Sequence, residues 1–86
     1  MSELTLGQLI DIVRQYGEQD EDVRIEITEE CRGKSLRDLG FDSLGIFNVT
    51  VQVSGMFQLD LPYDDVATAD TLDVLLAVIN KKFAEK

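Results

Sequence analysis

Histidine is absent from this 86-residue chain, and cysteine and proline each occur once. Without histidine the chain cannot build a Ser/His or Cys/His nucleophile pair, and it lacks the commonest zinc ligand. The lone Cys31 cannot form a disulfide within the chain, which favours a reducing compartment, and we expect it to be a loop or semi-buried thiol. These absences argue against a stand-alone enzyme, so we predict no catalytic residue and no metal site.

Positive charge is also scarce. Eight basic residues stand against 17 acidic ones, which gives a formal net charge of −9. A polyanion of this kind repels nucleic acids and anionic lipids, so basic protein surfaces are the expected partners. The N-terminus shows no signal pattern, and the uncharged run 43–59 is too polar to span a membrane. We therefore expect a soluble, cytoplasmic protein that is monomeric on its own and has no nucleic-acid or membrane partner.

A chain of this length fits one domain with one modest core. Thr5 and Gln8 have the spacing of a capping box, and apolar residues follow at helical spacing, so a helix is predicted over 5–17. Gly17 is its expected stop.

Residues 18–42 form a long connection. Its acidic cluster, 18–22, fails as a calcium loop because Arg24 and Ile25 would occupy a ligand position and the glycine position. Val23, Ile25 and Ile27 alternate with charges, which fits either a short extended piece or a loop that tucks apolar side chains onto a core.

Residues 44–59 carry two superimposed periodicities. Apolar residues alternate with polar ones, which taken alone favours a strand over 46–54 and an α+β fold. The same segment also has a helical face, made of Ile46, Val49, Val53, Met56 and Phe57. β-branched residues lower helix propensity by only some tenths of a kcal/mol each, so packing can decide for the helix.

The last quarter of the chain reads as helical. Pro62 ends the preceding element, and residues 63–67 can form a short helix with acids in its first turn. Asp70 or Thr71 can cap the final helix, whose lysine-rich end suits the helix dipole. That helix has an apolar stripe made of Leu72, Leu75, Leu76, Ile79 and Phe83.

The string Leu39-Gly40-Phe41-Asp42-Ser43-Leu44 carries the chemistry. Gly40 permits a tight turn, and Asp42 can cap the helix that follows. Ser43 would then lie exposed at a helix N-terminus, where backbone N–H groups and the helix dipole favour a phosphodiester. Leu44 is expected to point back to the core and anchor the turn.

This string resembles the phosphopantetheine attachment motif of acyl carrier proteins. The resemblance covers essentially the whole chain, and it includes the later motifs Leu61-Pro62, Asp70-Thr71, Leu75-Leu76 and Ile79-Asn80. The chain looks most like the carriers of type II (aromatic) polyketide synthases. The resemblance implies an all-α, four-helix acyl-carrier-type bundle, with three main helices, one short helix and a long first loop, forming a single carrier domain over 1–86.

The same resemblance implies a covalent 4′-phosphopantetheine arm, which a phosphopantetheinyl transferase moves from coenzyme A onto Ser43. Asp42 would help that transferase, and Gly40 and Leu44 would complete the attachment site. The arm would carry polyketide intermediates as thioesters to a ketosynthase with its chain-length factor, an acyltransferase, a reductase or a cyclase. A carrier of fatty-acyl or other secondary-metabolite chains, and an unmodified acidic interaction module, are the alternatives.

The chain departs from the family in its second helix, where carriers usually present acids to their partners. Residues 43–59 contain no charge. We therefore expect docking through exposed apolar positions such as Val51 or Ile46, flanked by Asp42, Asp64 and Asp65. The alternative is a helix that is buried on more than one side. Family members can also sequester the acyl chain between their helices, and the small and apolar residues here permit it.

Overall fold

The computed structural model describes residues 3–17 and 25–85. Within them the chain forms a 3-10 turn, η1 (Glu29–Cys31), and four α-helices, α1 (Leu6–Tyr16), α2 (Ser43–Phe57), α3 (Tyr63–Val66) and α4 (Leu72–Glu85). The described residues contain no strand, only one isolated bridge between Ser35 and Thr71. The predicted all-α bundle with one short helix and a long first loop is confirmed.

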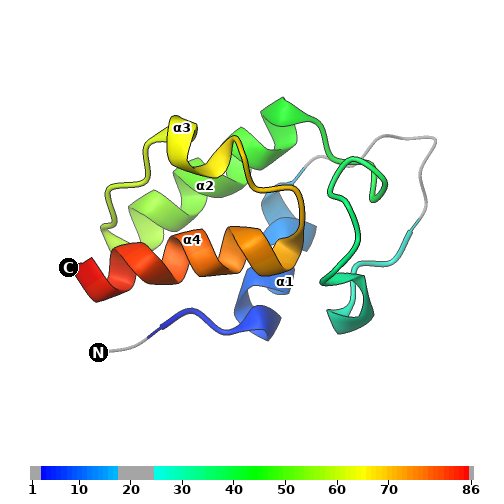
Figure 1. Ribbon diagram of the computed structural model, residues 1–86, viewed down its shortest axis with the longest axis horizontal. Coiled ribbons are helices and arrows are strands. Elements are labelled where there is room, and N and C mark those ends of the chain that lie inside the picture. The colour runs from blue at the N-terminus through cyan, green and yellow to red at the C-terminus, as the bar shows by residue number, and fades with distance from the viewer. Residues whose placement is uncertain (1–2, 18–24, 86) are drawn as a thin grey trace.

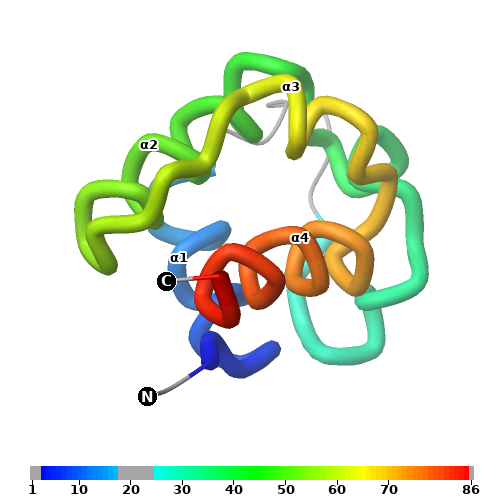
Figure 2. The backbone as a smooth tube through the Cα atoms, turned by 60° about the vertical axis from the view of Figure 1, so that its left-hand side comes forward, coloured from blue at the N-terminus to red at the C-terminus, as the bar shows by residue number. Residues whose placement is uncertain are grey.

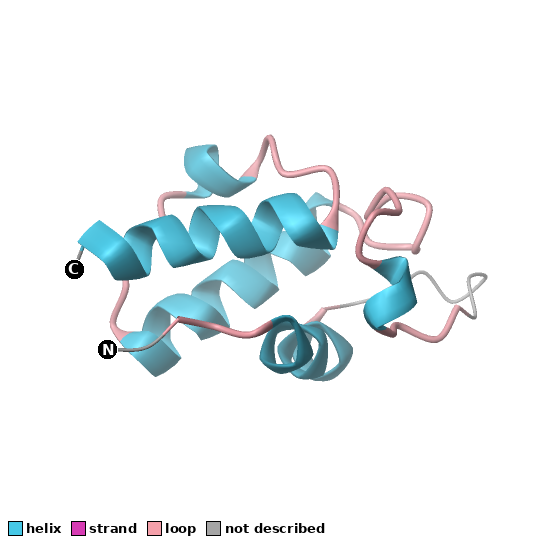
Figure 3. Cartoon of the chain, turned by 60° about the horizontal axis from the view of Figure 1, so that its bottom comes forward, coloured by secondary structure: helices cyan, strands magenta, loops and turns pink. Residues whose placement is uncertain are grey.

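Figure 1 shows α2 and α4 both running along the length of the molecule, with the short α3 over them and α1 crossing steeply. Figure 3, turned about the horizontal axis, shows the same crossing with α1 nearly end-on. In the backbone trace of Figure 2, α2 and α3 lie on one side of the molecule and α4 lies on the other. No helix in the described part of the chain is long and apolar enough to cross a membrane.

The capping box predicted for α1 is present. The Gln8 amide N–H donates to the Thr5 hydroxyl oxygen at 3.1 Å, and the Thr5 N–H donates to the Gln8 side-chain oxygen at 2.9 Å. These two bonds satisfy N–H groups that have no partner within the helix. The helix then buries one apolar face, made of Leu9, Ile10, Ile12 and Val13.

Residues 43–57 are helical, so the strand considered over 46–54 is wrong. Ile46, Val49 and Val53 are buried on one face of α2, as the helical periodicity predicted. Met56 is 54% exposed and does not belong to that face. Thr50 completes this face. Its buried hydroxyl donates to the Ile46 carbonyl at 2.9 Å, so the hydroxyl keeps a hydrogen-bond partner inside the core. Packing of this face into the core outweighs the small propensity cost of the β-branched residues.

The long connection is fastened to the start of α4. The Leu36 N–H donates to the Asp70 carbonyl at 2.7 Å, and the Asp73 N–H donates to the Arg32 carbonyl at 3.1 Å. The Arg32 Nε also pairs with the Asp73 carboxylate at 2.8 Å. These contacts hold the segment that leads into α2 against the start of α4. The two segments lie more than 30 residues apart in the sequence.

Several expectations for this connection are settled. Residues 25–28 are a loop, and Ile27 lies buried in the core. Cys31 is fully buried at the end of η1, deeper than the semi-buried loop thiol we expected. Val23, Arg24 and the acidic cluster 18–22 lie outside the described residues.

The helix α4 has the predicted cap and stripe. The Thr71 hydroxyl accepts from the Val74 N–H at 3.2 Å, so Thr71 rather than Asp70 supplies the capping side chain. The Asn80 side chain bonds both the N–H and the carbonyl of Leu4, at 2.8 and 3.0 Å, and ties the N-terminal segment to α4. The stripe residues Leu72, Leu75 and Ile79 are fully buried.

Gly17 ends α1, as predicted, but the reason is a close approach. Its φ of −75° is open to any residue. A Cβ placed there would lie 2.7 Å from the Val13 carbonyl oxygen and 2.9 Å from the ring of Phe41. Phe41 is buried directly before the Asp42-Ser43 pair, so Gly17 makes room for the ring that leads into α2.

We predict that Gly17→Ala destabilises the fold by about 1–3 kcal/mol, the usual cost of overpacking, because the Phe41 ring and the Val13 carbonyl must both move. Gly55→Ala is the matched control, since a Cβ at Gly55 meets nothing within 4 Å. In a helix interior that change should stabilise by about 0.5–1 kcal/mol. Urea unfolding of both variants measures the difference, and equal midpoints would contradict the account of Gly17.

Candidate functional site

Ser43 is the first residue of α2 and is exposed to solvent. In Figure 1 this end of α2 lies beside the long connection, at the opposite end of the molecule from the end of α4. No group in residues 3–17 or 25–85 makes a hydrogen bond to the Ser43 hydroxyl. A modifying enzyme can therefore reach the oxygen without breaking an internal bond.

Asp42 fixes the helix start beneath this serine. Its backbone is extended, with φ −101° and ψ −177°, and its carboxylate accepts from the Gly45 N–H at 2.9 Å. The Asp42 carbonyl accepts from the Ile46 N–H at 3.1 Å. Asp42 is thus the N-cap that the sequence predicted, and it determines where α2 begins.

The turn before Asp42 requires a glycine. Gly40 has a φ of 91°, in the region that L side chains rarely adopt. The turn is closed by bonds from the Gly40 N–H to the Arg37 carbonyl at 3.0 Å and from the Phe41 N–H to the Leu36 carbonyl at 3.0 Å. The tight turn predicted at Gly40 is confirmed.

Leu44 does not anchor this turn. It is 59% exposed, so the expectation that it points back to the core is wrong. The buried face of α2 passes through Gly45, Ile46 and Val49, and Leu44 lies on the opposite side of the helix. Phe41, on the other side of the Asp42-Ser43 pair, is the buried apolar residue that holds the turn.

Leu44 instead begins an exposed apolar stripe on α2. Phe47 and Val51 follow at spacings of three and four residues, and they are 44% and 47% exposed. Ile46, which we expected on this surface, is only 8% exposed and belongs to the core. The helix is therefore buried on one side only, and its outer side is apolar and uncharged. We call Leu44, Phe47 and Val51 the outer stripe.

The helix start suits a phosphodiester on Ser43. Within the described residues, the backbone N–H groups of Ser43 and Leu44 have no acceptor, whereas those of Gly45 and Ile46 bond to Asp42. Unpaired N–H groups at the positive end of a helix stabilise an anion placed there. The residues present at this position fit a phosphate ester on the serine oxygen.

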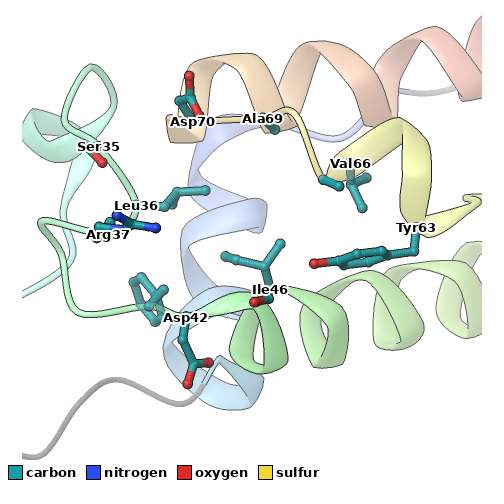
Figure 4. Close-up of a pocket in the computed structure, with 12 residues that line it drawn as sticks. Ser35, Leu36, Arg37, Asp42, Ile46, Tyr63, Val66, Ala69 and Asp70 are labelled. Carbon is teal, nitrogen blue, oxygen red and sulfur yellow. The ribbon is translucent and has the colours of Figure 1, made fainter.

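A cavity of about 500 Å³ adjoins the serine. Ser43 and Asp42 form part of its wall, and the connection, α3 and the chain before α4 supply the rest. Figure 4 shows Leu36, Ile46 and Val66 pointing into this space. A cavity of this size lies in the range of small-molecule sites.

Comparison with known proteins adds an independent line of evidence. The sequence pattern of the family described as "Phosphopantetheine attachment site" matches residues 23–79, which include the whole Leu39–Leu44 motif. A search of curated proteins found no match.

Solved structures of similar fold are acyl carrier proteins, and those for actinorhodin come from a polyketide synthase. The acetyl actinorhodin acyl carrier protein from Streptomyces coelicolor matches with a TM-score of 0.80 and 25% identity over 98% of this chain and 95% of that one. The holo form from the same organism matches with a TM-score of 0.77, 25% identity and the same coverage. The oxytetracycline acyl carrier protein matches with a TM-score of 0.78 and 25% identity, over 99% of this chain and 87% of that one.

The capping role of Asp42 predicts a difference between two substitutions. Asp42→Ala removes the acceptor for the Gly45 N–H and should destabilise the fold by about 0.5–2 kcal/mol. Asp42→Asn keeps an oxygen in place and should cost only the lost charge at the helix N-terminus, about 0.3–1 kcal/mol. Thermal unfolding of both variants measures this. If Asn proved as damaging as Ala, the Asp42–Gly45 bond would not be what fixes the helix start.

Proposed function

This chain belongs to the phosphopantetheine attachment-site family, and we propose that Ser43 is the residue on which it carries the arm. The exposed Ser43 hydroxyl, unpaired at the capped start of α2, is the observation that carries the proposal. In the attachment step the serine oxygen bonds to the phosphorus of coenzyme A that bears the pantetheine. The bond from that phosphorus to the 3′,5′-ADP portion breaks, and the hydroxyl proton passes to the transferase.

The chain is an acyl carrier protein, and its cofactor is covalent 4′-phosphopantetheine. The arm supplies a terminal thiol that holds acyl groups as thioesters. The chain's own contribution is to tether those groups and so raise their concentration at partner enzymes. We infer that it acts as one non-catalytic carrier domain across residues 1–86, and the match over 98–99% of its length to carriers of similar size supports this.

We further propose that the acyl groups are polyketide intermediates. The likeness to the actinorhodin and oxytetracycline carriers supports this choice over a fatty-acyl carrier. The partners would be a ketosynthase with its chain-length factor, an acyltransferase, a reductase or a cyclase, besides the phosphopantetheinyl transferase. The single reduced cysteine, Cys31, fits a cytoplasmic setting for this work.

The outer stripe is the surface we propose for docking these enzymes. It starts next to Ser43 and carries no charge, so a partner bound there lies within reach of the arm. Exposed apolar residues in one line are a common mark of protein interfaces. Carriers of this family usually present acidic residues on this helix. Here the same helix would dock partners through apolar contact instead.

The two acidic residues of α3 near the outer stripe differ in their partners. Asp65 pairs with the Lys82 ammonium at 3.0 Å, and this hydrogen bond raises the pKa of Lys82 above its ordinary value. Asp64 is exposed and has no ion pair in the described part of the chain. We therefore assign the electrostatic part of docking to Asp64, with Asp42 beside the serine, and leave Asp65 to its bond with α4.

The attachment site is tested by intact mass. After incubation with coenzyme A and a promiscuous phosphopantetheinyl transferase, the wild type should gain the mass of one phosphopantetheine and Ser43→Ala should gain none. Ser54→Ala is the matched control, since it removes a serine from the far end of the same helix and should gain the arm in full. A folded, unmodified wild type that gains no mass would overturn the proposed function and favour an unmodified interaction module.

The docking surface is tested by the rate of arm transfer. Val51→Gln should lower kcat/KM of the transferase about tenfold, the effect of losing one well-buried apolar contact at an interface. Val74→Gln is the matched control, because Val74 is 44% exposed but lies on α4. It should stay within about twofold of the wild type, since substitutions outside an interface core are nearly neutral. Equal effects of the two variants would remove the outer stripe from the docking site.

The contribution of Asp64 to docking is measured in the same assay. Asp64→Lys should slow transfer at low salt and lose most of its effect as ionic strength rises, because exposed charges act mainly through steering. Asp11→Lys makes the same charge change on α1 and should leave the rate unchanged. A rate that is unaffected by Asp64→Lys would show that apolar contact alone guides docking.

A further inference from the structure

Arg37 is the basic residue nearest to Ser43 in the sequence, and no lysine or arginine occurs between positions 38 and 80. Among the described residues that line the cavity beside Ser43, Arg37 is the only base, whereas Asp42 and Asp70 supply two acids. Figure 4 shows the Arg37 guanidinium pointing into this space and both carboxylates pointing out of it. The serine therefore shares its surroundings with a single cation.

This cation has no partner in the part of the chain that the structure describes. The Arg37 side chain makes no hydrogen bond or ion pair within residues 3–17 and 25–85. The reason is not a lack of carboxylates, since the chain has 17 acidic residues and eight basic ones. The Asp42 carboxylate, at the same cavity, is used as the cap of α2. Three other basic side chains each pair with a carboxylate at 2.8–3.1 Å, namely Arg14, Arg32 and Lys82.

The backbone holds Arg37 in a fixed place relative to Ser43. The Arg37 carbonyl accepts from the Gly40 N–H at 3.0 Å, and the carbonyl of the neighbouring Leu36 accepts from the Phe41 N–H at 3.0 Å. Phe41 is buried two positions before Ser43. Only the side-chain torsions of Arg37 are left free by this turn, so a group placed on Ser43 meets the guanidinium at a high local concentration.

The group proposed for Ser43 is a phosphodiester, which carries one negative charge. It would enter a chain with a net charge of −9, directly beside Asp42, and like charges repel it there. A guanidinium presents a planar fork of N–H donors that matches two oxygens of a phosphate. An ion pair with Arg37 would offset the repulsion, and no carboxylate of the described residues competes for that arginine.

We propose that Arg37 binds the phosphate of the phosphopantetheine arm on Ser43 and so sets the direction in which the arm leaves the protein. The inference rests on the proposed attachment at Ser43 and adds a positioning residue to it. The ion pair ties the root of the arm to the connection between α1 and α2. The pantetheine part beyond the phosphate stays free to move, and Arg37 takes part in no bond change.

The test compares the unmodified protein with the protein that carries the arm alone, and intact mass first establishes that the arm is attached. A ¹H–¹⁵N spectrum then reports on the arginine Nε–H groups. On attachment the Arg37 Nε–H should shift, and its exchange with water should slow about two- to fivefold at low salt, as expected of an exposed ion pair. The Arg32 Nε–H already pairs with Asp73 at 2.8 Å, so it is the internal reference and should not change.

Arg37→Gln and Lys34→Gln are a matched pair of variants. Both remove one positive charge from an exposed side chain of the same connection, but Lys34 does not line the cavity. The ³¹P resonance of the arm should shift from its wild-type position in Arg37→Gln and stay in place in Lys34→Gln. Arg37→Lys keeps the charge without the fork and should give an intermediate shift. In about 1 M salt, where the screening length is about 3 Å, the wild-type resonance should move most of the way to that of Arg37→Gln.

Other results would overturn the inference while leaving the attachment intact. An unchanged Arg37 Nε–H, or the same ³¹P shift in the wild type and Arg37→Gln, would show that the phosphate is held without Arg37. An equal shift of the Arg37 Nε–H in unmodified protein with one equivalent of inorganic phosphate would assign this cation to free anions and not to the arm. Failure of the arm to attach would overturn the proposed function, and this inference with it, and intact mass distinguishes that case from the others.

Discussion

The packing of the Phe41 ring against Gly17 is the contact on which the rest of the site depends. It buries the residue just before the Asp42-Ser43 pair, with 2.9 Å between the ring and the place where a Cβ would stand at Gly17. On the other side of the turn, the Leu36 N–H bonds to the Asp70 carbonyl at 2.7 Å. The segment that leads into α2 is thus held by α1 and by the start of α4. Its two ends are fixed while Ser43 stays in solvent.

The two faces of α2 have different roles, one in stabilising the fold and one in contacting partners. The inner face of α2, with Val49 and Val53, contributes to the core, and the outer stripe is left for partners. Because the helix carries no charge, neither face depends on ion pairs, and apolar burial is the main energy available on both. The charge of the molecule lies in the loops and the other helices, where its acidic excess can steer an approaching basic surface.

Local signals predicted those parts of the fold whose causes are local. The Thr5–Gln8 capping box, the Asp42 cap and the glycine turn at Gly40 each involve residues within five positions of one another, and each was found. The position of Leu44 was not predictable in the same way. Which side of α2 faces the core depends on α1 and α4, which are distant in sequence, and the same dependence left strand and helix unresolved over 46–54. Arg37 and Tyr63 both line the cavity beside Ser43 but lie 26 positions apart in the sequence, so only the folded chain brings them together.

The central claim is that a phosphodiester forms on the Ser43 oxygen. A phosphorus–proton correlation spectrum of the protein after treatment with coenzyme A and transferase tests it most directly. The account predicts one phosphodiester signal that correlates with the β protons of Ser43 and with those of no other serine. A spectrum without that signal, or one whose signal correlates with Ser35 or Ser54, would contradict the account.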